Sequence, residues 1–223
     1  PPSPPPLLYP PFVEVIASWG ADAHFATLCY STADHGFSAS TFHSRCDGRG
    51  ASVTIWRYEN GVIAGGYSSV SWASPRSNYN GYYGAYSSSS TAFLFSLSTN
   101  HKHAIRNPSA AIYNHRNSGP TFGNAVGNGH DFSLSSSMRT GYCSLGNAYE
   151  CRVGTAGSAE CADDFTGGGA SSWQIDQLEV WVGARYPPLP PSSPLPPPSP
   201  PSSPSPPLPP PSPPPPPSPP PPP

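Results

Sequence analysis

The sequence predicts a mostly β domain of the α+β class. Two antiparallel sheets form a β-sandwich with one or two small helices, and a polyproline II arm flanks each end. Seven of the 36 prolines lie in residues 1–11 and 26 lie in residues 187–223, so very few interrupt the central chain. Between these ends, short runs of alternating apolar and polar residues are separated by Gly, Ser and Asn, which is typical of antiparallel strands. We therefore expect a proline-rich arm over 1–11, one domain over 12–186 and a Ser/Pro-rich rod over 187–223.

The stretch LCYSTADHGFSASTFHSRCDG predicts a strand, a loop and then a short helix. Ser38 or Ser40 can cap the start of the helix, and Phe42 and Cys46 lie four residues apart on one of its faces. Gly48 can end the helix, because glycine readily adopts the left-handed backbone conformation that often follows a last turn.

The next stretch, SVTIWRYENGVIAGGYSSVSW, predicts a β-hairpin. Residues 53–58 place apolar side chains on both faces of the first strand. Asn60-Gly61 is a dipeptide typical of tight hairpin turns that need a positive φ. Gly65-Gly66 predicts either a β-bulge or a close approach of another group to the backbone.

Two more strands complete the predicted sheets. TAFLFSLS places Phe93, Phe95 and Leu97 on one face, and short strands follow within residues 99–130. The closing strand, WQIDQLEVWVG, changes the phase of its apolar residues, so we expect a bend or bulge near Asp176.

These landmarks resemble the TLDc domain family over nearly all of residues 20–183. The resemblance implies a β-sandwich of two antiparallel sheets with peripheral helices, and no accepted catalytic constellation. Its intracellular members are associated with resistance to oxidative stress and with regulation of the vacuolar proton pump. The blocks AFLFSL, FGNAVGNGHDFSLSS and SWQIDQLEVW match the family. An N-terminal signature also matches, through His35-Gly36-Phe37, Cys46-Asp47-Gly48, Gly61, Gly65-Gly66-Tyr67 and Trp72.

The two proline-rich arms resemble the tracts of hydroxyproline-rich glycoproteins of green algae and plants, such as extensins and pherophorins. That resemblance implies hydroxylated prolines that carry O-linked, arabinose-rich chains. No Asn-x-Ser/Thr sequon occurs in the chain, so any glycan is expected to be O-linked. The candidate hydroxylation and glycosylation sites are Pro4, Pro5, Pro6, Pro188, Pro190, Pro191, Pro194, Pro196, Pro197, Pro198, Pro200, Pro201, Pro204, Pro206 and Pro207.

The five cysteines favour one or two disulfides, with at least one thiol left unpaired within the chain. No CxxC pair is present, which argues against a zinc site. A reduced domain with buried free cysteines is the alternative, but the proline-rich arms favour an oxidising exterior. The candidate disulfide residues are Cys29, Cys46, Cys143, Cys151 and Cys161.

The charge and motifs of the chain exclude several classes of function. Charged residues make up only 10% of the chain and the net charge is −2, which argues against nucleic acid as a partner. No apolar run is long enough to span a bilayer. We find no nucleophile elbow and no phosphate loop, so we expect no catalytic residue, no cofactor and no enzymatic activity.

Metal binding is also not expected. His101 and His103 share one face of a strand but lack a third ligand at a suitable spacing. Asp131 and the Asp163-Asp164 pair lie among glycines, yet they lack the regular oxygen-ligand spacing of calcium loops.

A tyrosine-rich loop supplies the candidate contact residues Tyr79, Tyr82, Tyr83 and Tyr86. Aromatic faces stack on sugars, and also on proline rings in grooves that recognise polyproline. The alternative is a loop that simply packs on its own domain.

The leading hypothesis is an extracellular structural glycoprotein of algal or plant type, located at the cell surface, wall or flagellar surface. It would self-assemble head to tail into a glycosylated fibril, filament or matrix, because two rods on one domain suggest a repeating assembly. One alternative is an extracellular module that binds polysaccharide or glycosylated polyproline. A second alternative is a redox or stress-response role, which would require a reactive thiol.

Overall fold

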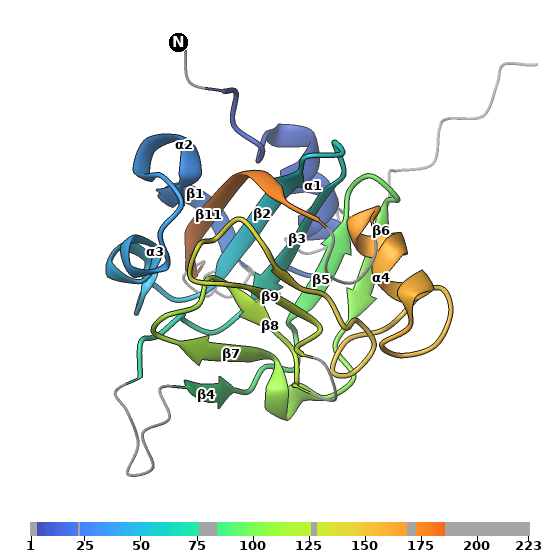
Figure 1. Cartoon of the computed structure of the whole chain (residues 1–223). Coiled ribbons are helices and arrows are strands. Elements are labelled where there is room, and N and C mark those ends of the chain that lie inside the picture. The colour runs from blue at the N-terminus through green and yellow to red at the C-terminus, as the bar shows by residue number, and fades with distance from the viewer. Residues whose placement is uncertain (1–3, 22, 76–83, 126–128, 169–172, 186–223) are drawn as a thin grey trace, which may run out of the picture. The chain divides into compact units, whose positions relative to one another are not determined.

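The computed structural model describes residues 4–21, 23–75, 84–125, 129–168 and 173–185, which all belong to one compact unit (Figure 1). The described helices are α1 (Pro10–Ser18), α2 (Thr32–His35), α3 (Ala39–Cys46), the 3-10 helix η1 (Pro108–Ala110) and α4 (Ala159–Thr166). The described strands are β1 (Ala23–Ser31), β2 (Ser52–Tyr58), β3 (Ile63–Ser68), β4 (Gly84–Ser87), β5 (Phe93–Ser96), β6 (His101–Ala104), β7 (Ile112–His115), β8 (Thr121–Phe122), β9 (Phe132–Leu134), β10 (Gly141–Tyr142) and β11 (Ile175–Arg185).

The strands form two antiparallel sheets, which confirms the predicted fold class. The six-stranded sheet has the order β1-β11-β2-β3-β5-β6, and the five-stranded sheet has the order β10-β9-β8-β7-β4. The closing strand β11 therefore lies between β1 and β2, inside the larger sheet rather than at its edge. This position requires the two ends of the domain to meet, since β1 and β11 are far apart in sequence.

The main core lies between the two sheets. Trp56 of β2 stacks on Phe132 of β9, with ring centroids 4.1 Å apart and an interplanar angle of 5°. Trp173 stacks on the same Phe132 ring at 5.5 Å. The neighbours of Trp56 along β2, Val53 and Ile55, point to the opposite face, where they enter a second core. Both faces of β2 are thus buried, as its sequence predicts.

The second core covers the outer face of the six-stranded sheet and is closed by the N-terminal segment. Leu7, Leu8 and Ile16 are buried there against β-strand residues such as Phe93 and Phe95. The domain therefore has three layers, which are the N-terminal segment with α1, the six-stranded sheet and the five-stranded sheet (Figure 1).

Hydrogen bonds attach the N-terminal segment to β11. The backbone N–H groups of Leu7 and Leu8 donate to the buried carboxylate of Glu179, at 2.8 and 3.3 Å. The Gln177 side chain donates to the carbonyl of Pro5 at 3.0 Å, and the Trp181 indole also donates to Glu179 at 2.8 Å. Part of the segment that the sequence assigned to an arm thus contacts the domain.

Helices α1 and α4 lie where the sequence analysis expected none. Helix α1 begins inside the predicted arm, with Pro10 and Pro11 in its first turn, where prolines lack only amides that a helix leaves unpaired. Helix α4 is capped by Ser158, whose side chain accepts from the Cys161 N–H, and it ends at Gly167. Each helix has a residue typical of a helix start, which is Pro10 for α1 and Ser158 for α4. The sequence analysis missed both because the surrounding residues are rich in proline or in glycine and serine.

The structure confirms the predicted bulge in β11 and decides two alternatives that the sequence left open, the cap of α3 and the role of Gly65-Gly66. Ser38, rather than Ser40, caps α3 by accepting from the Thr41 N–H. The register of β11 against β2 shifts between Ile175 and Gln177, which is the expected bulge. The diglycine at Gly65-Gly66 is a close approach and not a bulge. Its pairing with β2 runs without a shift, and a Cβ atom on Gly66 would lie 2.5 Å from the Phe122 ring.

Candidate functional site

Four of the five cysteines form two disulfides. Cys29 of β1 is bonded to Cys46 of α3, and Cys151 is bonded to Cys161 of α4. The fifth, Cys143, is buried, and burial raises the pKa of its thiol to about 12. The prediction of one or two disulfides with an unpaired thiol is confirmed, and the unpaired residue is a protonated, inaccessible thiol rather than a nucleophile.

A buried carboxylate joins the Gly-rich segment that precedes β9 to the segment that follows β10. Asp131 accepts four backbone N–H bonds from residues 146–149, at 2.8–3.1 Å, and a fifth from Asn124 at 3.2 Å. A Cβ atom on Gly123 would lie 2.0 Å from its carboxylate, so only glycine admits this approach. Burial raises the pKa of Asp131 to about 6, while these amide donors act to lower it.

This arrangement explains why Asp131 lies among glycines. Its oxygens accept backbone amides, which use the lone pairs that a cation would need. Among the described residues, no group of three or more His, Cys, Asp or Glu side chains is arranged to hold a metal ion.

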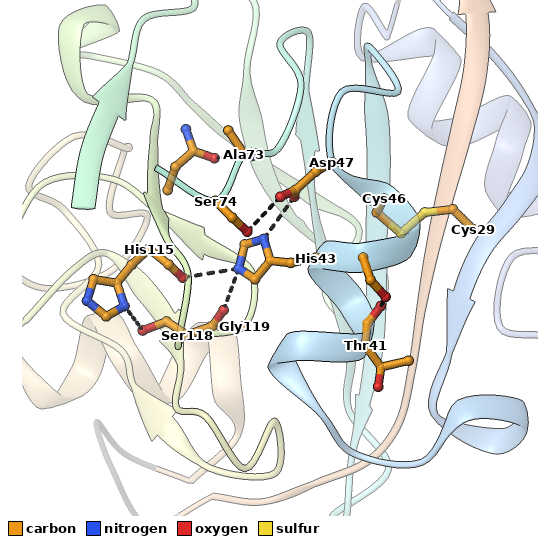
Figure 2. A network of polar contacts seen from close by, with 12 residues as sticks. Cys29, Thr41, His43, Cys46, Asp47, Ala73, Ser74, His115, Ser118 and Gly119 are labelled. Carbon is orange, nitrogen blue, oxygen red and sulfur yellow. Dashed lines mark hydrogen bonds and ion pairs between the residues drawn. A yellow bond between two sulfur atoms is a disulfide. The ribbon is translucent and has the colours of Figure 1, made fainter. Parts of the chain in front are cut away.

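His43 of α3 joins the helix to the loop after β7 (Figure 2). Its Nδ1 lies 2.8 Å from a carboxylate oxygen of Asp47, and its Nε2 lies 3.1 and 3.0 Å from the carbonyls of His115 and Ser118. Ser74 donates to the other Asp47 oxygen at 2.7 Å. These polar contacts cross from α3 to the five-stranded sheet, next to the Cys29–Cys46 disulfide.

The His43 network contains the residue types of a catalytic triad but not its geometry. A general base needs a free nitrogen facing a nucleophile. Here Ser74 contacts Asp47 instead of His43, and the Nε2 of His43 faces two carbonyl oxygens. The network is therefore a structural link. It was not predicted, because its members are up to 75 residues apart in sequence.

A groove of about 720 Å³ lies on the five-stranded sheet. Residues of β7, β9 and β10 line it, among them Tyr113, Ser133 and Tyr142. Their neighbours along the strands, such as Ile112 and Phe132, point into the main core. The groove consequently opens on the face of the sheet that points away from the six-stranded sheet. It was missed in the sequence because its residues come from short, weakly patterned strands.

Comparison with models of known protein families shows the family to which the chain belongs. A profile of the TLDc domain matches residues 15–183, which is most of the chain. The chain belongs to the TLDc domain family. No curated protein matches it.

The TLDc signature residues in the N-terminal block have structural roles here. The Tyr30 hydroxyl donates to the Gly36 carbonyl at 2.5 Å and accepts from the Ser38 N–H at 3.2 Å. His35 stacks on Tyr30, and Phe37 lies beneath the Arg139 guanidinium at 4.4 Å. These contacts of the family motif fix the turn around α2.

The paired histidines of the TLDc domain do share one face of β6, as predicted. The rings of His101 and His103 lie 4.8 Å apart. The Nδ1–H of His103 donates to the Glu150 carbonyl at 2.9 Å, while its Nε2 is buried without a partner among the described residues. Burial lowers the pKa of His103 to about 4.

The other predicted site residues are only partly described. Tyr79, Tyr82 and Tyr83 lie outside the described residues, as do all the candidate prolines from Pro188 onward. Tyr86 is 42% exposed on β4, and its ring lies 4.9 Å from that of Tyr113. The candidate residues Pro4, Pro5 and Pro6 are exposed. Within the described part of the chain, no helix is long and apolar enough to cross a membrane.

Proposed function

We propose that the chain is an extracellular structural glycoprotein, with a TLDc domain at residues 12–186 and a sugar-coated rod at residues 187–223. The observation that carries the proposal is the composition of the rod, in which 26 of 37 residues are proline. Contiguous proline lacks backbone donors and forms a polyproline II helix, which would span roughly 115 Å at ~3.1 Å per residue. Such a tract spaces or connects domains and builds no core of its own.

The state of the cysteines supports an extracellular location. Two disulfides, Cys29–Cys46 and Cys151–Cys161, suit an oxidising compartment better than the cytosol. The low charge of the chain fits the same proposal, since attached sugars would supply the solubility that charged side chains usually provide.

The assembly we propose is head to tail. A rod that contacts a different surface on the next copy makes a heterologous contact, which repeats into an open filament. Polyproline loses little conformational entropy on binding, which favours a permanent joint. Hydroxylated and glycosylated prolines at both ends would coat the filament with sugar.

Two measurements on protein from its native source test the proposal. Peptide mass spectrometry is expected to find hydroxyproline with pentose or hexose on the Ser/Pro tract. Electron microscopy is expected to show filaments or a fibrous matrix. Unmodified prolines would contradict the glycoprotein assignment, and dispersed monomers under native conditions would contradict the filament.

The TLDc family favours a second candidate, a role in the response to oxidative stress. That role needs a thiol or disulfide that reacts in the folded protein. Cys143 is buried with a pKa raised to about 12, so it does not supply the thiolate. The Cys151–Cys161 disulfide is the remaining candidate, because Cys151 is partly exposed.

Counting thiols in the full chain separates the two candidates. With a chromogenic disulfide reagent at neutral pH, we expect no labelling of the native protein and labelling of one thiol, Cys143, after unfolding. A Cys143→Ala variant should lose that signal. Rapid labelling of the native chain, or release of two further thiols at the redox potential of the cytosol, would instead support the stress-response role.

A further inference from the structure

A row of side chains crosses all five strands of the five-stranded sheet, and its members on β10, β9, β8 and β7 line the groove. Tyr142 pairs with Ser133, Ser133 pairs with Thr121, and Tyr86 pairs with Tyr113. The register of β7 against β8 places Tyr113 beside Thr121. The row thus has two small hydroxyl side chains between tyrosines. The strands that carry Tyr142 and Tyr113 lie roughly 14 Å apart, which is three strand spacings, and Ser133 and Thr121 lie between them.

Histidine rings extend the aromatic wall at Tyr113. His130 stacks on the Tyr113 ring at 4.7 Å with an interplanar angle of 28°, and His115 stacks on it at 6.0 Å and 18°. All three residues line the groove. Burial lowers the pKa of both histidines, so the wall is uncharged at neutral pH.

The hydrogen bonds of His115 and His130 determine whether the Nε2 atom of each ring is a donor or an acceptor for a ligand. The Nδ1–H of His130 donates to the Gly123 carbonyl at 2.9 Å, which leaves Nε2 as an acceptor. The Asn117 N–H donates to the Nδ1 of His115 at 3.3 Å, which places the proton on Nε2 as a donor. One wall of the groove therefore offers both a donor and an acceptor.

The composition of the groove selects the class of ligand. None of its described lining residues is Asp, Glu, Lys or Arg, so it has no charge with which to bind phosphate, nucleotide or an acidic polymer. Aromatic faces with scattered hydroxyl, donor and acceptor groups suit a ligand that has apolar faces and hydroxyls that both donate and accept. The proline residues of an unmodified Ser/Pro tract offer only acceptors, so they would leave the His130 nitrogen without a donor; only the few other residues of the tract could donate to it.

We propose that this groove binds a neutral oligosaccharide, with sugar rings against Tyr142 and Tyr113 and sugar hydroxyls bonded to His115, His130 and Ser133. The sugar could belong to a free polysaccharide or to an O-glycan on the Ser/Pro tract of a second copy. The inference stands apart from the filament proposal, because a free polysaccharide would bind whether or not the chain assembles.

The test uses the full chain produced without glycans and measures binding by titration calorimetry. The probes are neutral oligosaccharides of arabinose, galactose and glucose, an acidic oligogalacturonate, and peptides of residues 187–207 with and without attached sugar. We expect at least one neutral sugar to bind, and the acidic probe and the bare peptide not to bind. Binding of the free sugar alone identifies a polysaccharide, whereas tighter binding of the glycopeptide identifies the tract of another copy.

Variants locate the binding in the groove. Tyr142 is 55% exposed, so Tyr142→Ala should leave thermal unfolding unchanged while weakening binding by about tenfold, and Tyr142→Phe should retain the affinity. Tyr9→Ala is the matched control, since Tyr9 is 43% exposed and lies at the start of α1. The proposal is overturned if no neutral sugar binds, if the bare peptide binds equally well, or if the Tyr9 and Tyr142 variants weaken binding alike.

Discussion

Replacement of Asp131 by alanine is expected to lower the free energy of unfolding by about 3–5 kcal/mol. The carboxylate is fully buried and accepts N–H bonds from residues 146–149 and from Asn124. Alanine would leave these amides without their acceptor, and the bonds from Gly146, Ala148 and Tyr149 are buried. The loss should appear as a lower denaturant midpoint at pH 7 in urea unfolding followed by fluorescence.

Two comparisons show whether the Asp131 effect comes from the hydrogen bonds. Asp131→Asn preserves volume but turns an amide NH2 toward the donors, so most of the loss should remain. Asp163→Ala removes an exposed carboxylate from α4 and should change stability by less than about 0.5 kcal/mol. A small loss in the Asp131→Ala variant would mean that the Gly-rich segment keeps its structure without the carboxylate.

Acidification is expected to destabilise the domain through His103. Because burial lowers its pKa to about 4, the folded protein binds this proton less readily than the unfolded chain does. The stability that the neutral His103 contributes is therefore fully present above pH ~6.5. It is lost as the pH falls toward about 4, and the total loss in the free energy of unfolding is about 3 kcal/mol. The structural cause is the Nε2 atom, since a proton there would have no acceptor among the described residues.

The measurement compares urea unfolding of the parent and of His103→Asn between pH 7 and pH 4. Asparagine keeps a donor for the Glu150 carbonyl but does not titrate, so the variant should lose about 3 kcal/mol less on acidification. The comparison is needed because the raised pKa of Asp131 acts in the opposite direction over part of this range. His101→Asn is the matched control and should differ less, since His101 is only partly buried. Parallel pH profiles for parent and His103→Asn would contradict the assignment.

The features that the sequence predicted correctly are local ones. A hairpin turn at Asn60-Gly61, a cap at Ser38 and a bulge near Asp176 each depend on the few residues around them. Alternation over residues 53–58 likewise placed side chains on the two faces of β2 before any partner strand was known. The TLDc resemblance rested on four blocks in order, and it covers nearly the same residues as the family match.

The features that the sequence did not predict depend on groups that are distant in the chain. The carboxylate of Glu179 receives amides from Leu7 and Leu8, which are 172 and 171 residues away. The composition of the first residues indicated an arm. In the structure, Leu7 and Leu8 are buried against the six-stranded sheet and donate to Glu179, so part of this segment packs on the domain. Even the disulfide partners could not be assigned, because spacing alone does not show which cysteines meet.

The sequence by itself determined the fold class, the family and the proline-rich composition of residues 187–223, because these follow from periodicity, motif order and residue counts. Only the tertiary structure decided which groups face each other. It showed that Asp131 is surrounded by backbone amides, that Cys143 is buried and that four strands bring tyrosines and hydroxyls into one groove. Such sites arise from contacts between distant segments, and a pattern along one strand does not specify the strand beside it.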